Sequence, residues 1–384
     1  MATEDARYRL SSQYRLWSFA PAKLADLREK TNTLATNQIG ARLVDIKSSS
    51  STPNTSSVST PAAGDLPEFL TASEETLLLK FFTVELIRAA IFCELPTEVR
   101  ATAAVFLKRF YITNSVMTYP PTDLLKTCLF FGGKAEGYFA KLSKLADKFP
   151  NTTEEEILAG EFLLCQGIRF AFDVRHPFRG LEGAILELRR HDKFDTKRIE
   201  AAHIRAREIL KFSSLVTDAY LHYTPSQIML AALSLADRGL AEFIIDGTFD
   251  THNGQVIPSD GVAVQIKEKV TATIESCREL LSTELPERLQ DFWGTPESQK
   301  LIRPLVKKLR KCRDPDRADL VALQRARREA AAKASSDKEK KEKPRPIGDS
   351  DVFGGLMDLN EAREAKRRKV AAAAASADPF GGSL

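Results

Sequence analysis

The chain has 384 residues, of which 43% are hydrophobic, enough for two ordinary domains with buried cores plus tails. Its net charge is only +4, and a basic excess gathers in residues 321–346, so the remainder gives no electrostatic indication of DNA or RNA binding. The five cysteines contain no CxxC pair, and no stretch reaches the roughly 18 uninterrupted apolar residues of a membrane span. We therefore expect a soluble intracellular protein with reduced thiols, and no membrane partner.

The N-terminal region, residues 1–47, begins with an aromatic cluster and continues as a short amphipathic helix that starts near Pro21. The apolar residues behind this prediction are Tyr14, Trp17, Phe19, Leu24 and Leu27. Residues 48–69 are dominated by serine, threonine and proline. Because such a composition cannot build a core, we predict a linker there.

Residues 70–173 show a first series of five helical patterns separated by short breaks. The first three are predicted to start at Ser73, at Pro96 and at Pro120 or Pro121. The fourth is a short piece around Leu142 and Leu145, and the fifth starts at Asn151 or Thr152 and continues to about Ile168.

Residues 174–290 carry a second series of about five helices, which we predict at 177–190, 195–221, 225–238, 260–269 and 271–283. Several glycines and a proline in residues 239–259 indicate an insertion loop. One further helix is expected in residues 291–320, and residues 321–384 form a basic, low-complexity tail. No stretch alternates as a strand, so the predicted fold class is all-α, although periodicity does not reveal which helices pair.

Motifs that would indicate catalysis are missing from the sequence. The five histidines form no HExxH pair, and the GGK of residues 132–134 lacks the upstream glycine and the following Ser or Thr of a phosphate-binding loop. No GxGxxG, GxSxG or HRD motif occurs. We therefore expect no catalytic residues, no metal site and no cofactor.

Two charged residues occupy positions on apolar helical faces. Lys134 shares a face with Thr127 and Phe131, and Glu161 lies on the line of Ile157 and Leu164. A carboxylate on a buried stripe is costly unless it is paired. Three interpretations stay open at this point: the two charges neutralise each other, they receive partners from another chain, or they are ordinary solvated charges at helix ends.

Several stretches resemble the cyclin family and, within it, the cyclin H kind. These are VFLKRFYITNSVMTYPP (105–121), CLFFGGKAEG (128–137), EILAGEFLLCQGIRFAFDVRHPFRGLEGAIL (156–186), TDAYLHYTPSQIMLAALSLADR (217–238) and the early SSQYRLWSF (11–19). The resemblance covers about residues 70–312 plus the N-terminal patch. It implies two tandem five-helix cyclin boxes, 70–173 and 174–290, with flanking N- and C-terminal helices.

The resemblance also implies the function and the site. Lys134 and Glu161 would be the family's charge pair at the kinase interface, and Cys165, Phe170 and Phe172 would line the groove for the kinase's regulatory helix. The implied partners are a cyclin-dependent kinase catalytic subunit, the ménage-à-trois assembly factor and the core of transcription factor IIH. The chain would be a non-catalytic activator in the nucleus that supports phosphorylation of the RNA polymerase II tail.

Some residues depart from the family pattern, and other classes remain to be weighed. Lys108 stands where many cyclins carry an aspartate, and the substrate-docking patch of cell-cycle cyclins is missing.

The main alternative is a cyclin C-like subunit of the Mediator kinase, against which HYTPSQI (222–228) argues. A DNA-binding factor IIB-like double box is disfavoured by the near-neutral body, and an enzyme by the missing motifs. REAKRRKV (363–370) is either a nuclear-localisation signal or a solvated charge run.

Overall fold

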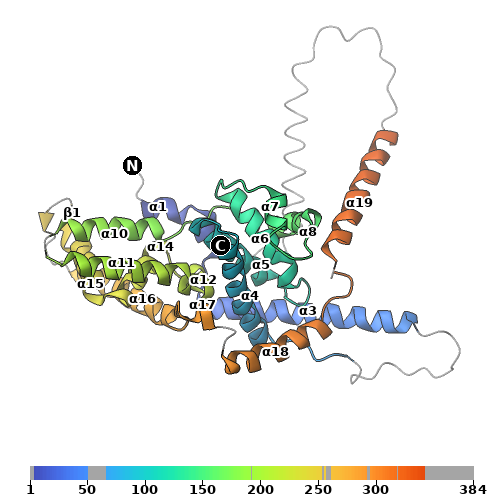
Figure 1. Cartoon of the computed structure of the whole chain (residues 1–384), viewed down its shortest axis with the longest axis horizontal. Helices are drawn as coiled ribbons and strands as arrows, with labels where there is room; N and C mark the ends of the chain where they lie inside the picture. Colours follow the sequence, from blue (N-terminus) through green and yellow to red (C-terminus); the bar gives the residue numbers. More distant parts are fainter. Residues whose placement is uncertain are drawn as a thin grey trace, which may run out of the picture. The chain divides into compact units, whose positions relative to one another are not determined.

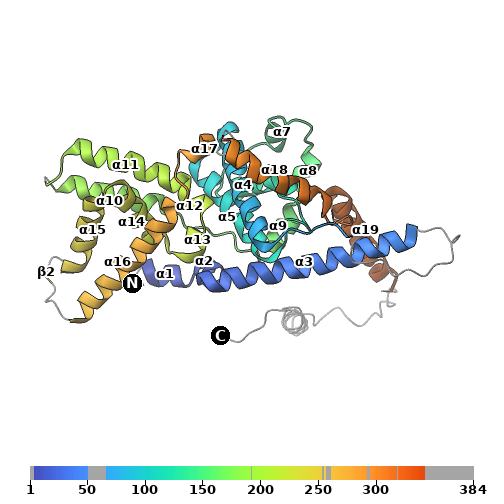
Figure 2. The ribbon, with the colours of Figure 1, turned by 90° about the horizontal axis from the view of Figure 1, so that it is seen from below.

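The computed structural model describes most of the chain, and the described part is dominated by helices (Figures 1 and 2). The described residues are 4–50, 66–191, 193–252, 255–256, 261–291, 295–317 and 319–341. Within these ranges the only strands are β1 (Thr251–His252) and β2 (Gln255–Val256), which pair as an antiparallel hairpin. The all-α prediction is therefore confirmed. The chain divides into a body, Met1–Ala326, and a second unit, Arg327–Leu384.

The first series of helices folds around one central helix. The helices are α4 (Ala72–Phe92), α5 (Thr97–Thr113), α6 (Pro121–Ala135), α7 (Leu142–Ala146), α8 (Glu154–Ala159) and α9 (Glu161–Gly167). From Val99 to Ile112 every side chain of α5 except Arg100 is buried, because α3, α4, α6, α9 and α12 pack around it. A helix that is buried on all sides must occupy such a central position.

Local capping chemistry sets several helix starts in this series. Thr71 caps α4 and Thr153 caps α8, each in a reciprocal pair with the glutamate three residues later. The predicted fifth helix is instead divided at Gly160 into α8 and α9. The hydroxyl of Thr127 donates to the carbonyl of Ile157 at 2.7 Å. In a continuous helix that carbonyl would accept from the amide four residues later. A Cβ at Gly160 would lie only 2.8 Å from that same hydroxyl oxygen.

The second series packs around α14 (Pro225–Ala236), which begins at the Thr224 capping box. Its other helices are α10 (Phe178–Arg190), α11 (Thr196–Lys211), α12 (Ser213–Val216), α13 (Ala219–His222), α15 (Arg238–Asp250) and α16 (Gly261–Ser282). The predicted helix 195–221 is wrong as one element, because the backbone turns out of helical geometry at Phe212. The predicted pieces 260–269 and 271–283 form the single helix α16, held by buried side chains at helical spacing: Ile274, Cys277 and Leu281.

The prediction of a loop at 239–259 is also wrong for its first half. Residues 239–250 belong to α15, and the hairpin follows. Leu240, Ala241 and Ile245 are buried on one face of α15. Their burial outweighs the helix-weakening effect of the two glycines in this segment, which is about 1 kcal/mol each.

The C-terminal segment of the body consists of α17 (Arg288–Asp291), α18 (Pro296–Lys311) and the start of α19 (Leu320–Lys341). Leu305 and Leu309 of α18 are buried, whereas Leu301, one turn before Leu305, is exposed. Arg325 of α19 forms two contacts with Glu155, at 3.0 and 2.9 Å. The first residues of α19, up to Ala326, therefore belong to the body, beyond the predicted boundary at residue 320. The predicted linker 48–69 is wrong at its start, because residues 48–50 belong to α3 (Pro21–Ser50), and its residues 51–65 lie outside the described residues. The tail from 342 and the signal at 363–370 also lie outside them.

The N-terminal helices are α1 (Glu4–Arg9), α2 (Ser12–Trp17) and α3 (Pro21–Ser50). The short helix predicted at Pro21 is correct in its start but is 30 residues long, and Figure 2 shows it as one rod along the body. Thr31 donates to the carbonyl of Ile112 in the first box at 2.9 Å, and Arg28 pairs with Asp218 in the second at 2.8 Å. This helix therefore contacts both boxes.

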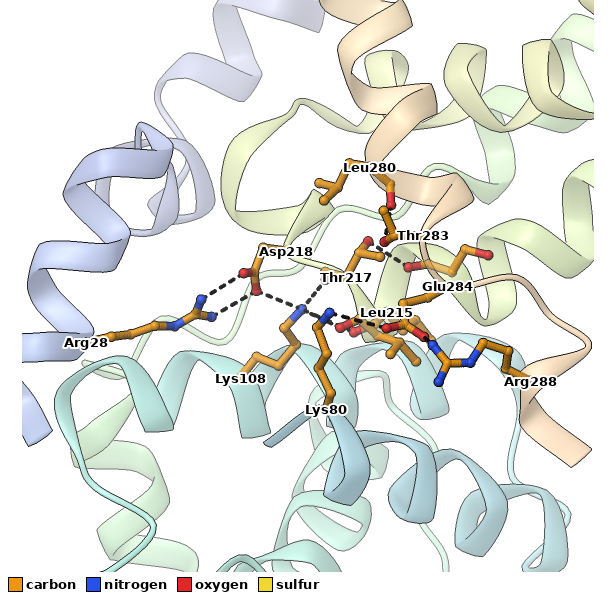
Figure 3. A network of polar contacts seen from close by, with 12 residues as sticks. Arg28, Lys80, Lys108, Leu215, Thr217, Asp218, Leu280, Thr283, Glu284 and Arg288 are labelled. Carbon is orange, nitrogen blue, oxygen red and sulfur yellow. Dashed lines mark hydrogen bonds and ion pairs between the residues drawn. The ribbon is translucent and has the colours of Figure 1, made fainter. Parts of the chain in front are cut away.

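A buried ionic network joins the two boxes (Figure 3). The ammonium group of Lys108 lies 3.2 Å from the carboxylate of Asp218 and donates to the carbonyls of residues 215, 216 and 217. Burial lowers the pKa of Lys108 to about 8 despite this pairing. Burial would raise the pKa of Asp218, but Lys108 and Arg28 outweigh it and hold that pKa well below its usual range. Lys108, the departure noted in the sequence, thus belongs to the junction between the boxes.

Candidate functional site

The structure brings Lys134 and Glu161 together. Lys134 is in the last turn of α6 and Glu161 opens α9, and the ammonium nitrogen lies 2.5 Å from the carboxylate. The side chains are 40% and 25% exposed, and the lysine also lies 4.6 Å from the ring centre of Phe130. Of the interpretations left open by the sequence, mutual neutralisation describes the geometry of the free protein.

Each charge also suits the helix end that carries it. A cation at the end of α6 and an anion at the start of α9 both interact favourably with the helix dipoles. Because both side chains are partly solvated, the pair contributes only about 0–1 kcal/mol to the stability of the free chain. Its main property is that two opposite charges are held ready at the surface, where a partner that excludes water would strengthen their interactions.

An exposed aromatic cluster lies beside the charge pair. We define it as Phe162, Phe170 and Phe172, which are 54%, 57% and 38% exposed. The ring of Phe170 lies 6.5 Å from that of Phe162 and 6.2 Å from that of Phe172, and Phe172 also packs edge-on against Phe131 at 5.1 Å. Large apolar side chains gathered on a surface mark an interaction site.

Phe162 was not anticipated from the sequence. The sequence did contain a signal for its exposure. Phe162 follows Glu161 and does not share the helix face of the buried Leu164 and Ile168, and an aromatic residue off the apolar face of a helix is exposed. Cys165, in contrast, is buried, and burial raises the pKa of its thiol. Cys165 is therefore a neutral side chain and does not present a reactive thiolate.

The backbone that carries Phe170 is strained. Arg169 and Phe170 have φ values of 55° and 54°, in the left-handed region that residues other than glycine rarely adopt. The amide of Phe170 donates to the carbonyl of Cys165 at 2.8 Å, which closes the end of α9. Two such residues cost about 1–3 kcal/mol each. Strain of this kind persists where the surrounding structure fixes it, and here it turns the Phe170 ring outward.

Arg109 anchors the segment that follows. Its guanidinium group is buried, donates to the carbonyl of Ala171 at 3.0 Å and lies 5.4 Å from the ring centre of Trp17. Burial lowers the pKa of Arg109 to about 10, so it remains charged at neutral pH. Gln13 adds a second support, because its side chain accepts from the amide of Arg175 at 2.7 Å. Arg109 of α5 and Gln13 of α2 thus fix the backbone of residues 171–175, which includes Phe172 of the aromatic cluster.

Neither a metal centre nor a membrane span was found in the described ranges. No group of three histidine, cysteine or acidic side chains there is arranged to hold an ion. No described helix combines the length and the apolar character needed to cross a bilayer. His176 instead joins the boxes, with its ring nitrogens 2.8 Å from Thr102 and from Tyr220. Its contact with Glu136 lowers the pKa of that carboxyl.

Comparisons with known proteins agree with this architecture. A family model, the cyclin C-terminal domain, matches residues 176–282. Cyclin CCL1 of Saccharomyces cerevisiae is 31% identical over 66% of this chain, and cyclin mcs2 of Schizosaccharomyces pombe is 32% identical over 59%. A protein named probable cyclin-H, from Echinococcus multilocularis, is 28% identical over 59%.

The match spans 63% of CCL1, 68% of mcs2 and 70% of the Echinococcus protein. Among solved structures, a chain of the CAK complex from Chaetomium thermophilum bound to ATP-γ-S is 52% identical to this one, with a TM-score of 0.75. That match covers 92% of this chain and all of the other. These similarities favour the cyclin H kind over the cyclin C alternative.

Proposed function

The chain belongs to the cyclin family, in its cyclin H branch, and from this premise we propose that it binds and activates a cyclin-dependent kinase. The observation that carries the proposal is the preformed surface on which the Lys134–Glu161 pair lies beside the exposed aromatic cluster. Such a surface offers an apolar patch and a charge pair to a helix of another protein.

The mechanism we infer is a shift in the kinase's conformational equilibrium. A kinase of this class needs the ion pair between its ATP-binding lysine and a glutamate on its regulatory helix. A surface that binds only the inward position of this helix favours the active state by the difference in affinity for the two positions. A change from 1:99 to 99:1 needs about 5.5 kcal/mol. Burial of the exposed halves of the three phenyl rings contributes about 2–4 kcal/mol, and only the part that the outward position of the helix lacks counts toward this shift.

Rigidity of the aromatic cluster supports this mechanism. The left-handed backbone at Phe170 and the Arg109 anchor at Ala171 fix the ring positions before a partner arrives. Because little ordering remains to be done on binding, more of the contact energy is available to discriminate between the two kinase conformations.

We further propose the setting implied by the family. The kinase would be the catalytic subunit of a CDK-activating kinase, completed by a ménage-à-trois assembly factor and bound to the core of transcription factor IIH. The complex would phosphorylate the RNA polymerase II tail in the nucleus. This chain would contribute no catalytic residue, no metal and no cofactor, and would not bind nucleic acid directly. The solved relative from a CAK complex supports this assignment.

The test is reconstitution. The kinase purified with its assembly factor is assayed on a polymerase tail peptide with and without the full-length chain. We expect a large gain in phosphorylation when the chain is added, and no phosphorylation by the chain alone. The proposal fails if the kinase shows the same activity without this chain. Mass spectrometry of the native complex identifies the partners independently, and recovery with a Mediator kinase would favour the cyclin C alternative.

A further inference from the structure

A cleft lies where the two boxes meet, apart from the candidate functional site described above. Its volume is about 570 Å³. The first box lines it with residues of α4 and the start of α5, and the second box with the end of α11, α12 and the segment 286–290. None of its lining residues belongs to the Lys134–Glu161 pair or to the aromatic cluster.

Two cationic side chains in this cleft make no ion pair or hydrogen bond with any described residue: those of Arg100 on α5 and of Lys211 at the end of α11. The Nε atom of Arg100 is buried without a partner. Burial lowers the pKa of Arg100. Burial and then repulsion from Arg207 and Arg100 lower the pKa of Lys211. Unpartnered buried donors and neighbouring like charges are both unfavourable, and a bound anion would relieve both.

The acidic side chains nearby are engaged elsewhere or are too far to pair. Glu287 and Glu208 lie 2.6 and 3.4 Å from Arg205, so that cation is neutralised within the cleft. Glu98, in the first turn of α5, acts on both Arg100 and Lys211, and Glu208 acts on Lys211, but neither forms an ion pair with them; both carboxylates partly offset the lowering of the pKa of these cations. Arg100 and Lys211 therefore remain as the cations available to a ligand among the described side chains.

A helix end adds a third attractive element. The helix α5 begins at Thr97, which lines the cleft, and its N-cap residue is Pro96. Pro96 has no side-chain acceptor, so the first amides of this 17-residue helix receive no side-chain cap. Uncapped amides at a helix start attract anions, particularly phosphate groups.

The rest of the cleft is apolar. The lining includes Ile87 and Ile91 from the first box, and Phe212, Leu215 and Leu289 from the second. Ile91 is 44% exposed, so part of this apolar wall is open to a partner. A free inorganic anion would use only the cationic end of the cleft. The remaining volume fits the apolar side chains of a peptide.

We propose that this cleft binds a phosphorylated serine or threonine carried on an extended segment of a partner protein. The phosphate would lie between Arg100 and Lys211 at the start of α5, and the flanking apolar residues of the segment would contact the wall that contains Ile91.

The charges favour phosphate over a carboxylate. A phosphoryl group carries a charge between −1.5 and −2 and three acceptor oxygens, which matches two cations and a set of free amides. A carboxylate would neutralise only one of the two. The planar guanidinium of Arg100 suits two phosphate oxygens at once. A nucleic acid is disfavoured, because its backbone needs several phosphate contacts and its bases need exposed aromatic rings, while Phe212 is buried.

The experiment uses the full-length chain and fluorescein-labelled peptide pools with a central phosphothreonine flanked by randomised apolar residues. Fluorescence polarisation compares this pool with the same pool carrying threonine or glutamate, and with inorganic phosphate as competitor. We expect the phosphorylated pool to bind at least tenfold tighter than either control pool, with affinity that falls as salt rises. Arg100→Gln and Lys211→Gln should each weaken binding roughly ten- to a hundredfold.

The matched controls are Lys197→Gln and Arg303→Gln, which remove exposed cations far from the cleft lining and should leave binding unchanged. Arg100→Lys keeps the charge but loses the planar fork, and should bind with intermediate affinity. Equal binding of phosphorylated and unphosphorylated pools would overturn the proposal, and so would unaltered binding in both glutamine variants. Binding of inorganic phosphate without binding of the peptide pool would also overturn it, because the segment is part of the proposal.

The proposal stands apart from the activating function. The variants at Arg100 and Lys211 are expected to activate the kinase on a short tail peptide as well as the unmodified chain does. Failure of phosphopeptide binding would therefore leave the activating role intact, and failure of kinase activation would leave the cleft to be judged by the polarisation assay alone.

Discussion

Replacement of Lys108 by methionine tests the ionic junction between the two boxes. Lys108 is only 5% exposed, and its ammonium group faces Asp218, with the cations Arg28 and Lys80 also acting on it. Methionine has a similar length and apolar stem but no charge and no donor. The variant therefore removes the titrating group and the hydrogen bonds to the carbonyls at the end of α12, while Asp218 keeps its two contacts with Arg28 at 2.8 and 2.9 Å.

The pKa of Lys108 sets the expected magnitude. Burial lowers it from 10.5 to about 8, which corresponds to about 3 kcal/mol in favour of the neutral amine in the folded protein. At a pH between these two pKa values, Lys108 is protonated in the unfolded chain and deprotonated in the folded chain. The unfolded state then binds more protons, so the free energy of unfolding rises with pH. From pH 7 to pH 10, Lys108 should add about 2–3 kcal/mol to that free energy.

The variant lacks this contribution. At pH 7 we expect it to be less stable by about 1–3 kcal/mol, because buried carbonyls lose their donor. The difference from the unmodified chain should widen as the pH rises from 8 to 10. Urea unfolding followed by circular dichroism at several pH values measures it, with the exposed Lys197→Met as the matched control. Parallel pH profiles for Lys108→Met and the unmodified chain would refute this account of the junction.

Three further predictions follow from the site and the fold. Lys134→Ala and Glu161→Ala should each weaken kinase binding by one to three orders of magnitude. The reason is that either change leaves the other charge unpaired at a desolvated interface, at a cost of about 2–5 kcal/mol. In calorimetry the double variant should lose less binding free energy than the two single variants together. Removal of residues 327–384 should preserve kinase activation and melting temperature, whereas removal of all of α19 should lower the melting temperature, because its first residues pack on the body. Gly167→Ala should destabilise the first box by about 1–3 kcal/mol in urea unfolding, because the added methyl group would collide with the Phe110 ring.

Each of these has a clear opposite outcome. Additive losses, or unchanged affinity in both single variants, would make the charge pair an ordinary surface contact. Loss of activation when residues 327–384 are removed would show that the second unit is needed. For the glycine, Gly183→Ala is the control, because a methyl group there meets open space. Equal stability of the two alanine variants would show that the collision is relieved.

Sequence patterns predicted the parts of the fold that local chemistry decides. The starts of α6 at Pro121 and of α14 at Thr224 and Pro225 follow from residues within one turn. The break at Gly160 does not, because it depends on the hydroxyl of Thr127 in another helix. The helical state of 239–250 depends likewise on burial against other helices, which composition does not reveal.

Likewise, only part of the candidate site could be predicted from the sequence. Lys134 and Glu161 were found because a charge on an apolar face is visible in periodicity. The left-handed backbone at Arg169 and Phe170 has no sequence signal, since neither residue is glycine or asparagine. The assignment of Lys108 to the box junction required its partner Asp218, which lies on another element and far along the chain.

The long helix α3 has a consequence for the order in which the protein assembles during synthesis. It leaves the ribosome among the first elements, yet its ion-pair partners Asp218 and Asp314 follow Arg28 and Arg42 by 190 and 272 residues. Contacts of α3 with the first box, such as that of Thr31 with Ile112, can form early, but its ion pairs with Asp218 and Asp314 must wait until almost the whole body has been translated. Contacts so distant along the chain also form slowly. The nascent chain should therefore carry α3 docked on the first box alone until the last helices of the body emerge and the rod completes its contacts with Asp218 and Asp314.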